Sequence, residues 1–216
     1  MDFAAARRTM VDSQIKTGAI TDPMIVEAMG AVPREQFLPE ARRSVAYVDE
    51  DLAIGKGRFV MEPLVLARLL QLAEVQPTDK ALVVGANGGY SAAVLARMAA
   101  SVIALDSDRE LSSAAGAAFA LAGVGNVQVV TGELTAGHAA GGPYDVILLG
   151  GAVAEIPGSL KLQLADGGRL VAIVREGRVG RGVVVERVGA AFGAVEQFNA
   201  VTPLLPGFER RASFVF

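Results

Sequence analysis

A glycine-rich turn and an acidic residue about twenty positions later are the features of this sequence with the clearest chemical potential. The turn reads Gly85-Ala-Asn-Gly-Gly-Tyr90 and closes a short apolar run, whereas Asp106 ends the next apolar run. Glycines let a backbone approach a ligand closely and adopt positive φ. An acid at this distance can accept hydrogen bonds from both hydroxyls of a ribose. The two features together predict a site for an adenosine-containing ligand.

Each feature also has a purely structural explanation. Many α/β proteins keep a glycine-rich turn for tight packing, and Asp106 could cap the following helix, a role that Asp108 could take equally well. The dinucleotide pattern G-x-G-x-x-G fits poorly, because Asn87 and Tyr90 occupy its second and third glycine positions. The methyltransferase spacing G-x-G-x-G fits at Gly85 and Gly89, with Asn87 between them.

The composition restricts the other chemistry that the chain can perform. Of its 216 residues, 52% are hydrophobic and 20% charged, which predicts one domain with a substantial core. It has no cysteine and only one histidine, His138, which excludes thiolate chemistry and multi-histidine metal centres. The formal net charge of −3 argues against a nucleic-acid partner. We therefore expect neither a metal site nor binding to nucleic acid.

The hydropathy pattern argues against a membrane partner. Charged residues, glycine or proline interrupt every apolar run before it reaches the roughly 18–20 residues of a membrane span. The first eight residues place an acid before the apolar residues, unlike a secretory signal. We expect a cytoplasmic protein.

Elements that alternate in type must position the turn and the acid. Apolar runs predict strands at 80–85, 101–106, 126–131, 144–149 and 168–174, and helical spacing predicts helices at 63–74, 89–99, 108–122 and 157–164. Such alternation is typical of a parallel sheet covered by helices on both faces. Residues 182–188, 192–202 and 211–216 alternate in polarity or are β-branched, which predicts antiparallel strands at the sheet edge.

The first third of the chain has a different pattern. Residues 3–17 and 22–31 are predicted to be helical, and Asp22-Pro23 is typical of a helix start. Residues 34–62 have mixed charge and weak periodicity, which predicts an extended loop. The expected fold is a Rossmann-like α/β sandwich, with a mostly parallel sheet, antiparallel C-terminal strands and an N-terminal helical cap. We expect one domain over 1–216, with the cap in 1–62 and the core in 63–216.

Five segments in one order carry a resemblance to a known family. They are RTMVDSQ (8–14), VPREQFLPE (32–40), AYVDEDLAIGKG (46–57), GYSAAVLA (89–96) and PYDVILLGGAVAEIPGSLKLQLADGGRLVAIV (143–174). With them the chain resembles the protein-L-isoaspartate O-methyltransferase family. The resemblance implies an S-adenosylmethionine-dependent methyltransferase sandwich. It also implies methyl transfer to the carboxylate of isoaspartyl residues in damaged proteins, which would be its partners.

The resemblance implies a substrate loop at Arg58, Phe59, Val60, Met61 and Glu62. The family's loop usually reads Gln-Thr-Ile-Ser-Gln-Pro, so Phe59 stands at the threonine and Met61 at the serine. The chain therefore lacks both hydroxyls, and we assign no catalytic residue. Arg58 could clamp a substrate carboxylate in their place, Glu62 could repel it, and Phe59 and Met61 could instead pack inward.

The resemblance also implies a cofactor site. It comprises Gly85, Ala86, Asn87, Gly89, Tyr90, Asp106 and Glu133. Val83 stands where the family has an acid for the methionine end of the cofactor, and Asn87 stands at the middle glycine. Losing one charge-assisted hydrogen bond costs about 1.5–3 kcal/mol, which predicts roughly ten- to hundredfold weaker cofactor binding. Two other functions stay open: a catalytically impaired binding or structural protein, and a methyltransferase for a different carboxylate or small molecule.

Overall fold

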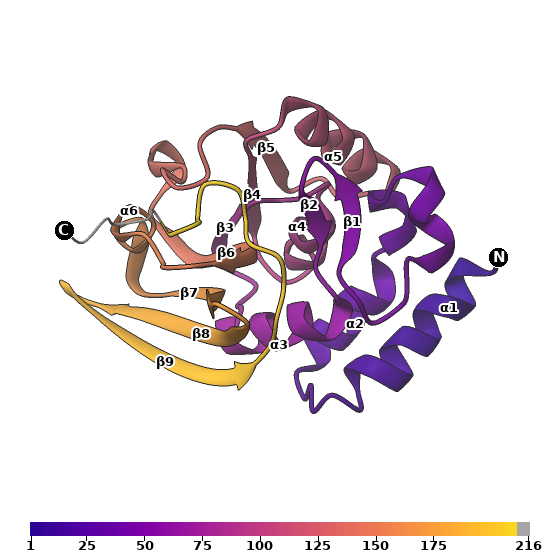
Figure 1. The fold of residues 1–216 in the computed structure, drawn as a ribbon, viewed down its shortest axis with the longest axis horizontal. Helices are drawn as coiled ribbons and strands as arrows, with labels where there is room; N and C mark the ends of the chain where they lie inside the picture. Colours follow the sequence, from indigo (N-terminus) through magenta and orange to yellow (C-terminus); the bar gives the residue numbers. More distant parts are fainter. Residues whose placement is uncertain (211–216) are drawn as a thin grey trace.

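A seven-stranded sheet forms the centre of the computed structural model, which describes residues 1–210. Its strand order is β5-β4-β3-β6-β7-β8-β9. The strands are β3 (Lys80–Val84), β4 (Ser101–Asp106), β5 (Val127–Thr131), β6 (Tyr144–Val153), β7 (Leu164–Glu176), β8 (Val179–Val188) and β9 (Ala191–Asn199). The pairs from β5 to β7 are parallel, and β8 and β9 are antiparallel. The predicted α/β sandwich is confirmed (Figure 1).

Helices cover the two faces of the sheet unequally. Side chains alternate along β3, so that Ala81 and Val83 enter one apolar cluster and Leu82 and Val84 enter the other. The larger cluster is covered by α3 (Pro63–Ala73), α4 (Tyr90–Ala96) and α5 (Arg109–Leu121). The smaller one is covered by α6 (Gly158–Lys161) and the C-terminal segment. Parallel strands buried on both faces explain the continuous apolar runs.

The N-terminal cap packs on the larger cluster. It comprises α1 (Phe3–Met10), a π-helical turn η1 (Val11–Ile15), α2 (Pro23–Ala31), and the 3₁₀ turns η2 (Arg34–Phe37) and η3 (Glu40–Val45). Asp22 caps α2, because its side chain accepts a hydrogen bond from the Met24 amide. The buried Ile25 and Met29 join the cap to the core. Both helices that the sequence predicts in this region are therefore present.

The segment 34–62 is not the extended loop that its weak periodicity predicts. Besides η2 and η3 it contains a hairpin of β1 (Leu52–Gly55) and β2 (Arg58–Val60), which forms a separate two-stranded sheet. Lys56 and Gly57 form the turn, with φ of 54° and 69°. Strands of four and three residues are too short for periodicity to reveal, and this explains the error.

The C-terminal segment returns across the carboxyl ends of the central strands (Figure 1). β9 ends at Asn199, before the predicted 202, and the predicted strand 211–216 lies outside the described residues. The Leu205 amide donates to the Ala152 carbonyl at 2.8 Å, and the Ala152 amide donates to the Pro203 carbonyl at 2.9 Å. These bonds attach the segment to the end of β6. None of the helices in residues 1–210 is long and apolar enough to cross a membrane.

The backbone of β6 at Gly150 passes very close to the backbone of Gly85, which follows β3. A Cβ at Gly150 would clash with the backbone carbonyl of Gly85, whereas a Cβ at Gly116 in α5 would meet nothing within 4 Å. We predict that Gly150→Ala lowers the free energy of unfolding by about 1–3 kcal/mol, because the backbone must shift. Gly116→Ala, the matched control, should raise it by about 0.5–1 kcal/mol, because alanine favours helix. Urea unfolding measures both, and an unchanged midpoint for Gly150→Ala would contradict the close approach.

Candidate functional site

The strand order creates a topological switch point beside β3. The chain leaves β3 towards β4 on one side, and β6 pairs with β3 on the other. Open α/β sheets bind ligands beyond the carboxyl ends of their strands at such a point. The turn 85–90, Asp106 at the end of β4 and Gly150 in β6 all lie there. The structure thus brings together the turn and the acid that the sequence singled out.

The turn after β3 has the backbone conformation that its composition predicts. Gly85, Asn87, Gly88 and Gly89 all have positive φ, with 48° at Asn87. Asparagine tolerates this left-handed region better than most residues, so it can replace a glycine here without severe strain. Every residue from Gly85 to Tyr90 is buried. The turn is therefore covered by other parts of the chain.

Asn87 connects the two sides of the switch point. Its side-chain amide donates to the Gly150 carbonyl at 2.7 Å, and its backbone amide donates to Asp106 Oδ2 at 2.9 Å. Its side-chain oxygen accepts a hydrogen bond from Arg58 Nη1 at 3.2 Å. A glycine at this position could make only the backbone contact. Asn87 thus acts as a buried polar bridge between the ends of β4 and β6.

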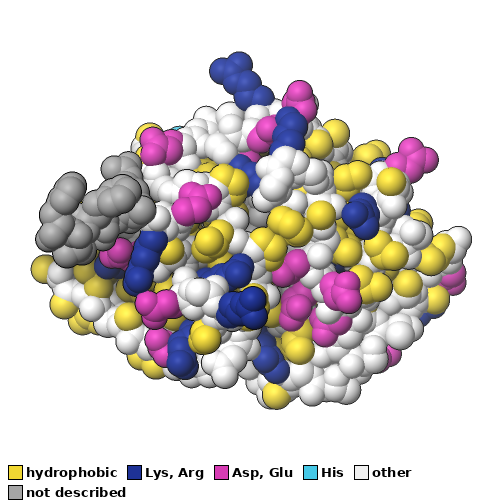
Figure 2. All heavy atoms as spheres, viewed as in Figure 1, with side chains coloured by type: hydrophobic (Ala, Val, Ile, Leu, Met, Phe, Trp, Pro, Cys, Tyr) yellow, Lys and Arg dark blue, Asp and Glu magenta, His cyan; other side chains and the backbone are white. Residues whose placement is uncertain are grey.

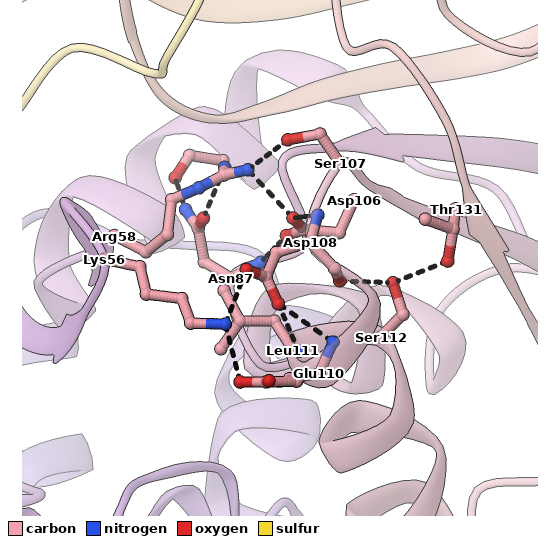
Figure 3. Close-up of polar contacts among 11 residues, drawn as sticks. Lys56, Arg58, Asn87, Asp106, Ser107, Asp108, Glu110, Leu111, Ser112 and Thr131 are labelled. Atoms are coloured by element: carbon pink, nitrogen blue, oxygen red, sulfur yellow. Dashed lines mark hydrogen bonds and ion pairs between the residues drawn. The ribbon is translucent and has the colours of Figure 1, made fainter.

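Asp106 is paired with Arg58 rather than open to solvent (Figure 3). Arg58 Nη2 donates to Asp106 Oδ1 at 2.9 Å and to the Ser107 hydroxyl at 2.6 Å. Asp106 Oδ1 also accepts a hydrogen bond from the Asp108 amide at 3.0 Å. Only 3% of the Arg58 side chain and 2% of the Asp106 side chain are exposed. Both carboxylate oxygens therefore have partners within the chain.

The hairpin that carries Arg58 is also attached at its tip. Lys56 Nζ lies 2.8 Å from Asp108 Oδ2 and 2.6 Å from Glu110 Oε2, at the start of α5. These exposed pairs contribute little stability, because solvent screens them. The buried Arg58–Asp106 pair differs, since removing one partner would leave a charge in a poorly solvated site. The hairpin is therefore held mainly by its buried arginine and its apolar side chains.

Leu205 covers the other end of the turn. A Cβ at Gly85 would lie 2.6 Å from Leu205 Cδ2, and one at Gly151 would lie 2.9 Å from Leu205 Cγ. Leu205 is 2% exposed. Glycines on both strands thus make room for this side chain. Arg58 on one side and Leu205 on the other fill the space next to the glycine turn.

Two further residues of the predicted substrate loop, Val60 and Met61, belong to the apolar cluster on which the cap packs. Val60 and Met61 are buried and Phe59 is half-buried. The fully buried Arg34 donates from Nη2 to the Met61 carbonyl at 2.9 Å and from Nε to the Ala46 carbonyl at 2.7 Å. Arg34 therefore holds the loop in place, and its position in the VPREQF segment is the only local sign of this role in the sequence.

Tyr90 lies on the same side as Arg34. The Arg34 guanidinium lies 4.6 Å from the centre of the Tyr90 ring, and the Phe37 ring meets that ring edge-on at 6.0 Å. Burial raises the pKa of the Tyr90 hydroxyl. The ring thus contacts the cap, and cofactor contact by Tyr90 stays a prediction.

Glu62 lies in an acidic environment at the end of the loop. Partial burial, together with the carboxylates of Asp49 and Asp51, raises its pKa to about 7, and Arg68 opposes this shift. The Glu62 amide donates to Asp51 Oδ1 at 3.0 Å. Glu62 therefore exchanges its proton near neutral pH.

Val83 and Glu133 lie on the two strands that flank β4, Val83 in β3 and Glu133 just after β5. Val83 is fully buried in the larger apolar cluster. Glu133 comes two residues after Thr131, the residue of β5 that pairs with Asp106 of β4. Glu133 accepts a hydrogen bond from the Thr135 hydroxyl at 2.6 Å. Across residues 1–210 no group of three or more histidine, aspartate or glutamate side chains is placed to hold a metal ion.

An adenosine-containing ligand matches this site in the type of its residues. Asp106 and Glu133 place carboxylates at the ends of the adjacent strands β4 and β5, and an acid in the position of Asp106 is the type of group that accepts hydrogen bonds from a ribose. The present arrangement conflicts with such a ligand at one place, since Arg58 and two amides already satisfy Asp106. Side chains of both charges are interspersed with hydrophobic ones over the face that carries the hairpin (Figure 2).

The fold and the switch-point site define a Rossmann-like α/β protein. A solved protein-L-isoaspartate O-methyltransferase superposes with a TM-score of 0.82 at 23% identity, over 93% of this chain and 66% of that one. The Plasmodium falciparum structure described as a putative protein-L-isoaspartate O-methyltransferase, in complex with S-adenosyl-L-homocysteine, superposes with 0.80 at 19% identity, over 92% and 97%. At these identities the likeness concerns the fold.

The sequence comparisons identify the family. The family model Protein-L-isoaspartate(D-aspartate) O-methyltransferase matches residues 5–200. Protein-L-isoaspartate O-methyltransferase 1 of Rhodopseudomonas palustris is 43% identical over 78% of this chain and 69% of its own length. The Methanoregula boonei relative, a protein-L-isoaspartate O-methyltransferase, is 40% identical over 86% of both chains. The chain belongs to the protein-L-isoaspartate O-methyltransferase family.

We predict that the stability cost of Glu62 depends on pH. A carboxyl whose pKa rises from about 4.5 to about 7 on folding binds more protons in the native state between these values. Its contribution to the free energy of unfolding therefore falls as pH rises from about 4.5 to 7 and is constant above. Glu62→Gln lacks this loss, so its stability relative to the wild type should increase over that window.

Urea midpoints measured from pH 4.5 to 8.5 check this prediction. Glu27→Gln, which alters an exposed glutamate on α2, is the matched control. A difference between Glu62→Gln and the wild type that stays constant with pH would contradict the raised pKa.

Proposed function

We propose that this protein is an S-adenosylmethionine-dependent carboxyl methyltransferase that acts on isoaspartyl residues of damaged proteins. The observation that carries the proposal is the family match over residues 5–200, combined with carboxylates at the ends of β4 and β5. The relatives named above are called protein-L-isoaspartate O-methyltransferases. Protein and peptide substrates that bear isoaspartate follow from the same membership.

The reaction requires little acid–base chemistry from the chain. S-adenosylmethionine, when bound, supplies an electrophilic methyl group, and a substrate carboxylate is already a competent nucleophile. The protein must therefore bind, align and desolvate the two reactants. Asp106 would hold the ribose, Glu133 the adenine, and the turn 85–90 would face the cofactor backbone. The loop 58–62 would receive the substrate carboxylate.

We infer that cofactor binding is weaker than the family's motif would give. Val83 is apolar and fully buried, so it supplies no acceptor for the methionine end. The Asn87 side chain reaches the Gly150 carbonyl and so occupies space that a glycine at position 87 would leave unfilled. Both differences act on binding rather than on the transferred methyl group.

A second function is favoured by one specific observation. Arg58 and Leu205 fill the space beside the glycine turn, as expected for a member that has lost cofactor binding and acts as a binding or structural protein. A methyltransferase for a different carboxylate or small molecule would instead keep the cofactor and change only the loop 58–62.

Calorimetric titration with S-adenosylhomocysteine, followed by methylation of an isoaspartyl peptide, tests the proposal. The proposed function predicts saturable binding and transfer of labelled methyl groups to the isoaspartyl peptide but not to its aspartyl counterpart. Binding without peptide methylation would contradict this substrate and favour a different acceptor. No binding at millimolar ligand, with no methylation, would favour the binding or structural protein.

Restoring the two hydroxyls of the substrate loop should raise peptide methylation. Phe59→Thr and Met61→Ser together return the family's side chains, and each recovered hydrogen bond to a charged group is worth about 1.5–3 kcal/mol. We predict at least a roughly tenfold rise in kcat/KM for the isoaspartyl peptide. Phe192→Thr makes the same change at a half-buried position on β9 and is the control. An unchanged kcat/KM in a folded double variant would show that these positions do not limit the reaction.

A further inference from the structure

We propose that Arg58 competes internally for the nucleoside site, so that a ribose can reach Asp106 only after hairpin β1–β2 has withdrawn the guanidinium. The inference rests on the proposed function insofar as it takes the ligand to be an adenosine derivative. It adds that binding requires a change of conformation, in which Arg58 leaves Asp106.

The hydrogen bonds of Asp106 show that its carboxylate is already occupied. Its Oδ1 accepts from Arg58 Nη2 at 2.9 Å and from the Asp108 amide at 3.0 Å, and its Oδ2 accepts from the Asn87 amide at 2.9 Å. The two amides belong to turns that are fixed at the ends of β3 and β4. Arg58 is the partner that comes from a separate element. A carboxylate accepts about four hydrogen bonds, and three are already made, so a ribose that binds through both hydroxyls must displace one donor. Arg58 is the donor that can leave without unfolding a turn of the sheet.

The contacts of Arg58 show that its position is specific. The same guanidinium donates to Asp106, to the Ser107 hydroxyl and to the Asn87 side chain, and Arg58 is 4% exposed. Neutral hydroxyls are weaker partners for a carboxylate than a charged guanidinium is. An adenosine ligand cannot gain the Asp106 contact without the cost of breaking this cluster.

The hairpin is the element that can move. β1 and β2 have four and three residues and pair only with each other, outside the seven-stranded sheet. Two-stranded hairpins of this size are marginally stable by themselves. The exposed contacts of Lys56 with Asp108 and Glu110 secure its tip. Leu52 and Val60 anchor the ends of the two strands in the core, so the part that can withdraw is the turn with Arg58. Its withdrawal would leave the strands of the seven-stranded sheet and their register intact.

A closed resting state weakens binding in proportion to the fraction of open molecules. If about 1% of molecules had the hairpin withdrawn, the apparent Kd would be about a hundredfold higher than that of the open site. Removing the guanidinium abolishes this competition while leaving Asp106, Glu133 and the turn in place.

Calorimetry with S-adenosylhomocysteine on the wild type and Arg58→Met tests the proposal. S-adenosylhomocysteine has no sulfonium charge, so tighter binding cannot come from relieved repulsion of a cationic ligand. We expect the Kd of Arg58→Met to be at least about tenfold lower than that of the wild type. Arg181→Met, which removes an exposed arginine paired with Glu196 at the sheet edge, should leave the Kd unchanged. A folded Arg58→Met with an unchanged or higher Kd would overturn the proposal.

Lys56→Gln keeps the proposal testable if Arg58→Met does not fold. It removes two exposed contacts at the hairpin tip, so the fold is preserved, and it should lower the Kd for S-adenosylhomocysteine about two- to fivefold by favouring withdrawal. An unchanged Kd in this variant would overturn the proposal in that case.

Two nucleosides identify the group for which Arg58 competes. The gain in affinity from Arg58→Met, or from Lys56→Gln if the first variant does not fold, should be several-fold larger for adenosine than for 2′,3′-dideoxyadenosine, which lacks the 2′- and 3′-hydroxyls of the sugar. Equal gains would overturn competition at Asp106. Tight binding by Arg58→Met without isoaspartyl methylation would support the inference and contradict the proposed function. Wild-type methylation with no gain from either variant would do the reverse.

Discussion

The buried ion pair between Arg58 and Asp106 is the interaction on which the arrangement of the switch-point site depends. The pair joins the hairpin β1–β2 to the end of β4. Asn87, which accepts a hydrogen bond from Arg58 and donates one to the Gly150 carbonyl, continues this network to β6. Desolvation opposes such a pair, so it persists only where further hydrogen bonds satisfy both charges. Ser107, Asn87 and two backbone amides supply these bonds. The buried polar groups of the site therefore form hydrogen bonds with one another.

The sheet determines where the site residues lie, and side chains from two peripheral segments determine what surrounds them. The central parallel strands place the turn, Asp106 and Glu133 at one edge, as in other proteins of this fold. Arg58 and Leu205 then approach that edge from the hairpin and from the C-terminal segment. Family membership is compatible with these contacts, because the family match covers residues 5–200, whereas the filling of the space beside the turn depends on single side chains such as Arg58 and Leu205.

Much of this architecture could be predicted from the sequence, because its signals are local. Apolar runs located β3 and β4, Asp22 and the following proline located α2, and the glycine turn located the switch point. The hairpin was missed because strands of four and three residues show no periodicity. The partnership of Arg58 with Asp106 was missed because it joins residues 48 positions apart. The contact of Leu205 with Gly85 depends in the same way on the path of the C-terminal segment.

A double-mutant cycle between Arg58→Met and Asp106→Asn, measured by urea unfolding, tests the central claim most directly. The cycle isolates the energy of the pair from the other effects of each substitution. A buried pair with shared partners predicts strong non-additivity, with a coupling energy of about 1–3 kcal/mol. Costs that simply add would contradict the account, because the hairpin would then be held over the cleft by something other than Arg58 and Asp106.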